Sequence, residues 1–174
     1  GCYVKRFLDL VFASFFLVIT FPLLVTIACL VACTSRGPVF FRQQRVGYKG
    51  RKFTILKFRT MVNDENEASH KDYVQHLLKE EEGGKERADL IEEYIGYIEK
   101  KRTPVGNILR KTSLDELPQL INILKGDMSL VGPRPHPVYE VEEYKNWYHR
   151  RLDVKPGLTG WSKLNLRLTP KNYE

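Results

Sequence analysis

A long apolar run near the start dominates the hydrophobic pattern of the chain. No charged side chain occurs within residues 10–35, and a helix needs roughly 20 apolar residues to reach across the hydrocarbon of a bilayer. A secretory signal peptide is the alternative, but the apolar core of a signal peptide has only about 7–15 residues. The pattern therefore predicts a retained membrane helix within residues 1–36.

Pro22 stands near the middle of this apolar run. A proline inside a helix removes one backbone hydrogen bond and bends the axis. Two arrangements follow: a helix that crosses the membrane with a kink, and a helix that dips in, breaks and returns to the same face. Basic residues favour the cytoplasmic side of a membrane, and they flank both ends of the run, at Lys5, Arg6, Arg36 and Arg42.

Two short segments rich in Phe, Val, Ile and Thr come next, at residues 39–45 and 52–60. The turn sequence at 47–50 separates them, and this arrangement predicts a β-hairpin. Side chains two residues apart in a strand point to the same side, so Lys57 and Arg59 are expected to share one face. A solvated strand face is the alternative to a functional pair of cations.

Helical periodicity with acidic outer faces marks residues 69–102. Two apolar stripes joined at Gly83 and Gly84 predict an antiparallel helix pair with a structural or oligomerisation role, a homodimer being one form of it. Residues 103–111 form a short amphipathic segment that is expected to lie in the membrane interface, with its cations toward the headgroups.

Two further helices are predicted in the second half of the chain. The first begins at Ser113 and ends near Gly126, and the second covers residues 140–152. The proline-rich stretch at 132–137 between them predicts a stiff loop.

These elements predict an α+β fold in a mainly helical, membrane-associated chain. Its 174 residues suit one domain beside the membrane segment. We expect a membrane helix at 1–36 and a cytoplasmic catalytic domain at 37–174, with a helical insertion at 63–102.

The charge pattern points to lipid headgroups as a partner. The net charge is +7, and residues 36–59 are rich in Lys and Arg but contain no acid. Such a block beside a membrane segment attracts anionic lipids by about 1 kcal/mol per cation. No nucleic-acid-binding signature accompanies the block, which argues against DNA or RNA as a partner. Three cysteines without a CxxC pair argue against a disulfide framework and structural zinc.

The adjacent carboxylates Asp115 and Glu116 are the leading candidates for chemistry. Ser113 and Glu116 fit a capping box, so both acids could serve only to complement a helix dipole. In the functional interpretation, the helix start binds phosphate through its free amides. Asp115 is then expected to have a depressed pKa and to stay ionised, and an ionised carboxylate can attack phosphorus to form an acyl phosphate.

Attack by an anion on a phosphate diester requires neutralisation of charge. Mg²⁺ would complement the cations, because it binds through one or two carboxylates plus substrate phosphates, and Asp115 is its candidate ligand. Arginine grips phosphate through two hydrogen bonds. The candidate phosphate-binding residues are Lys57, Arg59, Arg110 and Arg134.

Several ordered motifs resemble the bacterial sugar transferase family, the monotopic phosphoglycosyl transferases. They begin with KRFLD at residues 5–9 and GPVFFRQ at 37–43, and continue with KFRTM at 57–61 and LRKTSLDELPQL at 109–120. GDMSLVGPRP at 126–135 and KPGLTGW at 155–161 complete the match.

The resemblance implies a two-step transfer at the cytoplasmic face of the bacterial inner membrane. Asp115 would attack the sugar-bearing phosphate of a UDP-sugar and expel UMP, and undecaprenyl phosphate would then take the phosphosugar. Glu116 would orient or deprotonate the lipid phosphate, Mg²⁺ is expected, and Arg167 joins the nucleotide-binding candidates. The resemblance also implies a re-entrant membrane helix broken at Pro22. A non-catalytic scaffold that binds polyprenyl phosphate is the alternative function.

Overall fold

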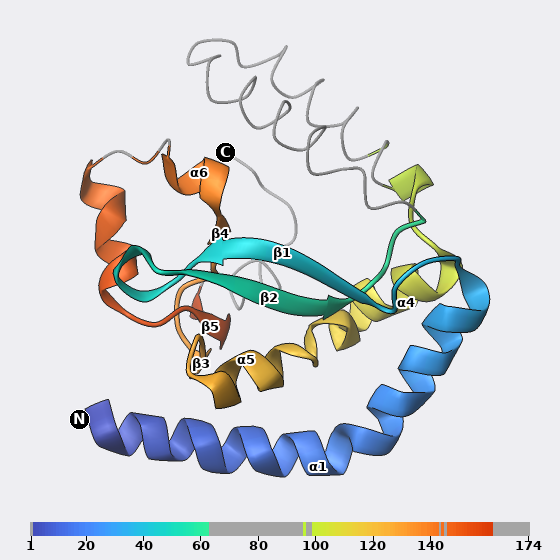
Figure 1. The fold of residues 1–174 in the computed structure, drawn as a ribbon, viewed down its shortest axis with the longest axis horizontal. Helices are drawn as coiled ribbons and strands as arrows, with labels where there is room; N and C mark the ends of the chain where they lie inside the picture. The colour runs from blue at the N-terminus through green and yellow to red at the C-terminus, as the bar shows by residue number, and fades with distance from the viewer. Residues whose placement is uncertain (1, 63–95, 97–98, 143, 145, 162–174) are drawn as a thin grey trace.

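The computed structural model describes residues 2–62, 96, 99–142, 144 and 146–161 (Figure 1). Most of the predicted helix pair within 69–102 falls outside these residues, and so does Arg167. What the structure describes is an α+β arrangement of one long N-terminal helix, a small sheet and several short helices.

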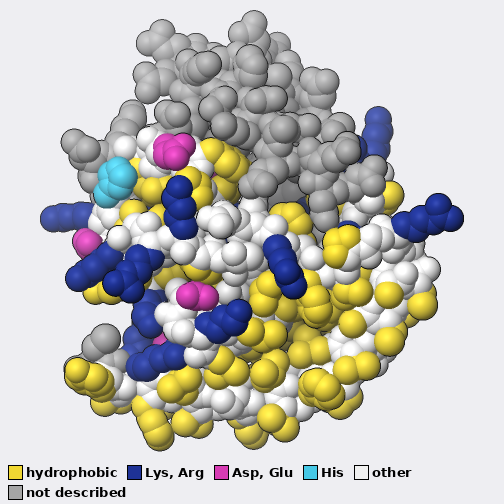
Figure 2. All heavy atoms as spheres, in the orientation of Figure 1, with side chains coloured by type: hydrophobic (Ala, Val, Ile, Leu, Met, Phe, Trp, Pro, Cys, Tyr) yellow, Lys and Arg dark blue, Asp and Glu magenta, His cyan; other side chains and the backbone are white. Residues whose placement is uncertain are grey.

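The long helix α1 (Cys2–Thr34) contains the whole apolar run, with Pro22 in its interior. Figure 1 shows that α1 bends between its N-terminal and C-terminal parts, as expected where a proline lacks the amide that would bond to the preceding turn. Among the described helices, α1 is long and apolar enough to cross a membrane. Figure 2 shows a continuous band of hydrophobic side chains over the region where α1 runs.

The N-terminal part of α1 is tied to the rest of the protein by polar contacts. The Arg6 guanidinium donates to the carbonyl oxygens of Ile123 and Leu124, at 2.6 and 2.9 Å. The buried Asp9 carboxylate accepts a hydrogen bond from the Ser129 hydroxyl at 3.1 Å. These bonds hold the beginning of the apolar helix against the same body that its other end contacts.

The C-terminal end of α1 is held in a similar way. The Arg59 guanidinium donates to the carbonyl and hydroxyl oxygens of Ser35, both at 2.7 Å. Ile27 and Val31 pack into a buried cluster with Phe58 and Leu109. Both ends of α1 therefore contact the body formed by the sheet and the short helices.

The predicted hairpin is confirmed. Strands β1 (Phe40–Val46) and β2 (Lys52–Phe58) pair antiparallel and are joined through the 3₁₀ turn η1 (Tyr48–Gly50). The short strand β4 (His136–Pro137) lies on the other side of β1. A separate parallel pair consists of β3 (Ser129–Val131) and β5 (Gly157–Thr159).

The short helices differ from expectation at Ser113. Helix α4 (Pro104–Thr112) is capped by the Thr103 hydroxyl, which accepts from the Gly106 amide at 2.8 Å. Ser113 does not begin the next helix: it adopts a left-handed conformation (φ 58°) after α4, and its side chain makes no capping bond. The predicted capping box is therefore wrong, because the chain uses Ser113 to turn between two helices.

The carboxylate pair lies in the 3₁₀ turn η2 (Leu114–Glu116), and helix α5 (Gln119–Lys125) follows it. Gly126 ends α5 in a left-handed conformation (φ 95°), as predicted, since glycine adopts this geometry without steric cost. The first core cluster joins α1, β2 and α5 through Ala13, Ile55 and Ile123. Figure 1 accordingly shows α5 between α1 and the hairpin.

The helix predicted at 140–152 is wrong as a single element. The structure has a short helix α6 (Val138–Glu142) and a 3₁₀ segment η3 (Asn146–Asp153). The Tyr144 amide bonds to the carbonyl of Val141, three residues back, at 3.2 Å, and the rings of Tyr144 and Tyr148 pack edge to face with centroids 4.6 Å apart. This aromatic packing accompanies the tighter turns, in a segment whose aromatic residues favour α-helix only weakly.

Candidate active site

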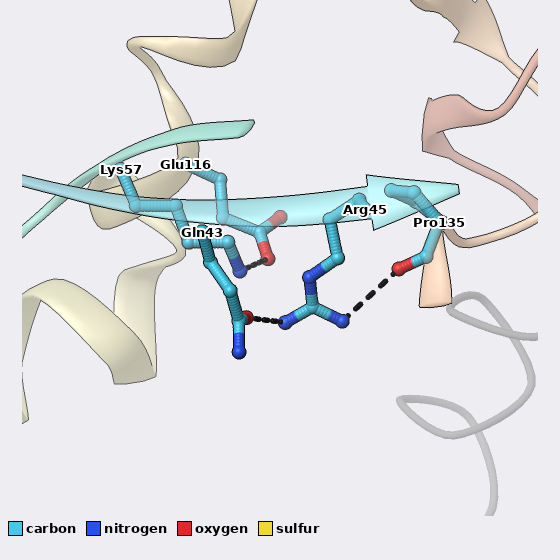
Figure 3. Close-up of polar contacts among 5 residues, drawn as sticks. All are labelled: Gln43, Arg45, Lys57, Glu116 and Pro135. Carbon is cyan, nitrogen blue, oxygen red and sulfur yellow. Dashed lines mark hydrogen bonds and ion pairs between the residues drawn. The ribbon is translucent and has the colours of Figure 1, made fainter. Parts of the chain in front are cut away.

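The register of the hairpin brings Lys57 to the carboxylate pair. In β2 Lys57 follows the buried Phe53 and Ile55 at intervals of two residues, so all three side chains point to the same, inner face. The Lys57 ammonium meets Glu116 in η2, with Nζ and Oε1 3.0 Å apart (Figure 3). Both side chains are mostly buried, so this ion pair is shielded from bulk water.

Asp115 is buried beside this pair, with 7% of its surface exposed. Burial raises the pKa of Asp115, and the nearby Lys57 and Arg110 oppose that rise while the Glu116 charge adds to it. The expected depression of the pKa is therefore wrong in direction. The prediction assumed a helix start whose free amides stabilise the charged carboxylate. Asp115 lies instead in a buried turn, where the loss of hydration destabilises its charged form.

Lys57 shows the complementary change. Burial lowers the pKa of Lys57, the charge of Glu116 opposes this, and the charge of Arg134 adds to it. A lysine and two acids thus share one desolvated cluster, in which each charge depends on the others.

An open hollow lies next to the cluster and is lined by Lys57 and Glu116 together with Arg134 and Arg45. Three of these four charged residues are basic. Cations in a partly closed hollow attract anions, and arginine in particular suits phosphate oxygens. The hollow is therefore suited to a phosphate-bearing ligand placed beside the carboxylates.

The loop that carries Arg134 is held by close backbone packing. The Gly132 amide donates to the carbonyl of Thr159 at 2.9 Å, and the Gly157 amide donates to that of Pro133 at 2.9 Å. A Cβ atom on Gly157 would lie 2.0 Å from the Gly132 nitrogen, so any larger residue would force the two segments apart. This contact fixes the wall of the hollow from which Arg134 extends.

Sequence reasoning missed Arg45, which braces the same loop. The Arg45 guanidinium donates to the carbonyl of Pro135 at 3.2 Å and to the Gln43 side chain (Figure 3). Gln43 and Arg45 stand opposite Ile55 and Phe53 in the hairpin register, on the buried face. The available signal was in the hairpin pattern: Gln43 and Arg45 are polar and alternate along one strand, at positions where the facing residues of the other strand are apolar.

The other predicted site residues are divided between two places. Arg110 is close enough to Asp115 for its charge to lower that pKa. Arg59 lies just beyond the end of β2, buried, with its guanidinium on Ser35 at the end of α1. The structure therefore groups Lys57, Arg110 and Arg134 near the carboxylates and engages Arg59 with the end of α1.

The part of the chain that the structure describes contains no group of three or more His, Cys, Asp or Glu side chains that could hold a metal ion. Asp115 and Glu116 are two adjacent carboxylates beside a hollow suited to phosphate. Mg²⁺ usually binds through one or two carboxylates plus substrate phosphates, so this donor set fits a magnesium ion shared with a substrate.

Comparison with known proteins places the chain among sugar transferases. The bacterial sugar transferase family matches residues 2–173. The UDP-glucose:undecaprenyl-phosphate glucose-1-phosphate transferase of Escherichia coli is 41% identical over 165 residues, which cover 93% of this chain and 31% of that protein. The undecaprenyl-phosphate galactose phosphotransferase of Salmonella typhimurium is 40% identical over 91% of this chain and 32% of its own length.

A shorter relative is covered more fully. The uncharacterized sugar transferase EpsL of Bacillus subtilis is 38% identical over 94% of this chain and 69% of its own length. The chain spans about a third of the length of the two longer relatives. With the family matched over nearly every residue, the chain belongs to the bacterial sugar transferase family.

Proposed function

We propose that this chain is the catalytic part of a membrane-bound phosphoglycosyl transferase, which moves a sugar 1-phosphate from a UDP-sugar to undecaprenyl phosphate. The buried Asp115 and its neighbour Glu116 carry the proposal, because Glu116 lines a basic hollow on the body that also holds the apolar helix α1. The names of the relatives support the two substrates, since they include UDP-glucose and undecaprenyl phosphate. The reaction is an early membrane step in polysaccharide synthesis.

In the first half-reaction Asp115 acts as the nucleophile. One of its carboxylate oxygens attacks the sugar-bearing phosphorus of the UDP-sugar. The bond from that phosphorus to the bridging oxygen breaks, and UMP leaves with the bridging oxygen. An aspartyl-phosphosugar remains on the protein, a mixed anhydride of a kind that carboxylate nucleophiles form. Lys57 and Arg134, which line the hollow, neutralise the charge on the phosphate oxygens.

In the second half-reaction undecaprenyl phosphate takes the phosphosugar. An oxygen of the lipid phosphate attacks the same phosphorus, the bond to Asp115 breaks, and the carboxylate is regenerated. The product is a sugar linked to the lipid through a diphosphate. Glu116 orients or deprotonates the lipid phosphate, and its ion pair with Lys57 at 3.0 Å keeps its carboxylate directed into the hollow.

Asp115 would hold Mg²⁺ together with the substrate phosphates, and the bound ion would supply charge neutralisation there. The adjacent Glu116 lines a hollow where an entering diphosphate would need this neutralisation. We expect removal of divalent cations by a chelator to lower UMP release.

We further propose that α1 is re-entrant, with both of its ends at the cytoplasmic face of the inner membrane. The contacts of Arg6 and Asp9 at one end and of Ser35 at the other, all with the same body, support this arrangement. A straight span would carry the two ends to opposite sides of the bilayer. In the re-entrant arrangement, the basic side chains of Lys5 and Arg36 both face anionic headgroups on the cytoplasmic side.

The test is UMP release from UDP-glucose, UDP-galactose, UDP-N-acetylglucosamine and UDP-N-acetylgalactosamine, measured in detergent with undecaprenyl phosphate present. We expect turnover with at least one of them. Asp115→Asn should abolish it, while the exposed Asp153→Asn, the matched control, should retain it. Undiminished turnover in Asp115→Asn would reject the assignment of the nucleophile.

Intact-mass measurement after incubation with a UDP-sugar alone separates catalysis from scaffolding. The transferase gains the mass of one phosphosugar, and Asp115→Asn gains none. A protein that binds undecaprenyl phosphate but neither releases UMP nor gains mass would be the non-catalytic scaffold instead.

A further inference from the structure

The loop that carries Arg134 is held through its carbonyl groups. Pro133 and Pro135 flank Arg134, and because proline has no amide hydrogen, only their carbonyl oxygens can take part in backbone hydrogen bonds. The Pro133 carbonyl accepts a hydrogen bond from β5 at 2.9 Å, and the Pro135 carbonyl accepts one from Arg45 at 3.2 Å. The carbonyl between them, that of Arg134 itself, accepts one from the Arg151 guanidinium at 3.2 Å. Three consecutive carbonyls are therefore held by three different segments.

Arg151 is itself held by aromatic rings. It lies in η3, and the central carbon of its guanidinium is 4.7 Å from the centroid of the Tyr148 ring and 5.8 Å from that of Tyr144. Among the described residues, no carboxylate forms an ion pair with Arg151. A guanidinium stacks favourably on aromatic faces. The two rings therefore hold the guanidinium where its donors meet the loop.

Arg134 connects the candidate site to Arg151. It lines the hollow beside Lys57 and Glu116, and its charge lowers the pKa of Lys57. It also lines a second hollow, which Tyr144 and Arg151 line as well. The side chain of Arg134 therefore acts on the side of the carboxylates, while its carbonyl faces η3 and is held there by Arg151.

The bond to this carbonyl controls where the Arg134 side chain points. The carbonyl carbon and the side chain share one Cα atom, so a rotation of the peptide plane changes the direction in which the guanidinium extends. The proposed transfer needs that guanidinium at the phosphate oxygens, and a misplacement of about 1 Å can cost about 100-fold in rate. Arg151 does not line the hollow beside the carboxylates, so its route to the reaction runs through Arg134.

We propose that Arg151 is a positioning residue, which holds the Arg134 backbone so that the Arg134 guanidinium reaches the phosphate of the UDP-sugar. The inference rests on the proposed function, because it requires Arg134 to neutralise that phosphate. It extends the working parts of the site to η3, a segment that contributes no residue to the hollow.

A double-mutant cycle between Arg151 and Arg134 tests the inference. Arg151→Met and Arg151→Gln remove the charge, and Arg134→Met removes the guanidinium that Arg151 is proposed to position. In the wild-type background, we expect kcat/KM for UMP release to fall at least about tenfold in both Arg151 variants. In the Arg134→Met background, the same changes should lower kcat/KM no further, because residues that act through one another are not additive. If Arg151→Met does not fold, Arg151→Gln, which keeps a polar side chain, completes the cycle.

Non-additivity separates positioning from a purely structural role. A residue that only stabilised the fold would lower kcat/KM by the same factor with and without the Arg134 side chain, and that result would overturn the inference. Arg151→Lys keeps the charge and a donor, so it should retain more activity than the two neutral variants. An equal loss in Arg151→Lys would also overturn the inference.

Arg150→Met is the matched control. Arg150 is exposed in the same segment and makes no hydrogen bond to the loop among the described residues, so this variant should match wild type in both backgrounds. If Arg150→Met loses as much as Arg151→Met, any loss of charge from η3 has this effect and the inference is wrong.

The two proposals fail separately. If wild type releases no UMP from any UDP-sugar, the proposed function fails before Arg151 is considered. If wild type releases UMP and forms the covalent phosphosugar while the Arg151 variants keep wild-type rates, only the inference about Arg151 fails.

Discussion

At the scale of single residues, the site depends on charges that have been taken out of water. Lys57 and Glu116 are separated by 59 positions in the chain and form a mostly buried pair. Asp115 beside them is also buried, and burial raises its pKa. In the proposed mechanism this desolvation makes Asp115 a reactive nucleophile, because it leaves the charge of the carboxylate poorly stabilised.

Asp115→Asn is expected to stabilise the protein while abolishing activity. A carboxyl group whose pKa rises on folding contributes stability below its unfolded pKa, and that contribution is lost as the pH rises through its folded pKa. At neutral pH the ionised Asp115 therefore weakens the fold, and the neutral amide removes this penalty. We expect a gain of about 0.5–2 kcal/mol, seen as a higher melting temperature, and a loss of turnover of at least about a thousandfold.

The exposed Asp153→Asn serves as the control for this trade-off, since it removes a charge without removing a buried one. It should change neither the melting temperature nor UMP release. A lower melting temperature for Asp115→Asn than for wild type would mean that the carboxylate stabilises the fold through contacts, contrary to the pKa argument.

The pH range in which kcat/KM is high should be limited on both the acidic and the basic side. The acidic limb reports protonation of Asp115 and should lie above the ordinary aspartate value of 3.8, because burial raises that pKa. The basic limb reports deprotonation of Lys57 and should lie below the ordinary lysine value of 10.5, because burial lowers that pKa. In Lys57→Arg the basic limb should move to higher pH, since arginine stays charged throughout this range. A basic limb that does not move in Lys57→Arg would remove Lys57 from the assignment.

At the scale of elements, the position of the carboxylates depends on how α5 meets the hairpin. β2 is an edge strand of its sheet, and an edge strand leaves backbone groups unpaired. Asn122 of α5 pairs with two of them, the carbonyl of Thr54 and the amide of Leu56. These two hydrogen bonds, called the Asn122 clip below, hold α5 against β2. They thereby fix η2, which precedes α5, against Lys57 in β2.

Removal of the clip by Asn122→Leu should cost about 1–3 kcal/mol, because it leaves buried backbone groups of β2 without a partner. UMP release should fall by about 10- to 100-fold, since small misplacements of reacting groups have effects of that size. Thermal unfolding in detergent and initial rates measure the two effects. The matched control is Asn107→Leu on α4, where the side chain makes no such bonds among the described residues. Equal rates for the two variants would show that the clip does not position the site.

At the scale of the whole molecule, the apolar helix and the body that contains the candidate site are one packed structure. α1 shares a buried cluster with β2 and α5 and a second one with β2 and α4. Much of its remaining surface is apolar and exposed (Figure 2), as the proposed insertion of α1 into a bilayer requires.

The labelling pattern of α1 should show both of its ends on the same side of the membrane. In a variant with all three native cysteines replaced by alanine, single cysteines are introduced as Tyr3→Cys or Arg36→Cys. A membrane-impermeant maleimide should label both positions in inverted inner-membrane vesicles and neither position in spheroplasts. The cysteine-free parent gives the background. Labelling of position 3 from the outer face would contradict re-entry and favour a spanning helix.

Local pattern was sufficient for much of this architecture. The apolar run in α1, the hairpin with its turn, the start of α4 and the end of α5 at Gly126 all follow from residue types and their spacing. The carboxylate pair and the cations near it could also be named in advance, because their chemical type and their order along the chain are properties of the sequence.

Other features were decided by tertiary packing. Ser113 adopts a left-handed conformation between α4 and η2, whose residues Leu109 and Leu114 pack against the same buried cluster, whereas its sequence favoured a cap. Arg59 contacts Ser35 because the end of α1 lies close to the end of β2. Arg45 lines the hollow because the loop at Pro135 lies close enough to accept its hydrogen bond. The direction of the pKa change in Asp115 belongs to this group as well. Residue type and spacing specify local backbone preference, but desolvation and long-range contacts exist only once distant segments have come together.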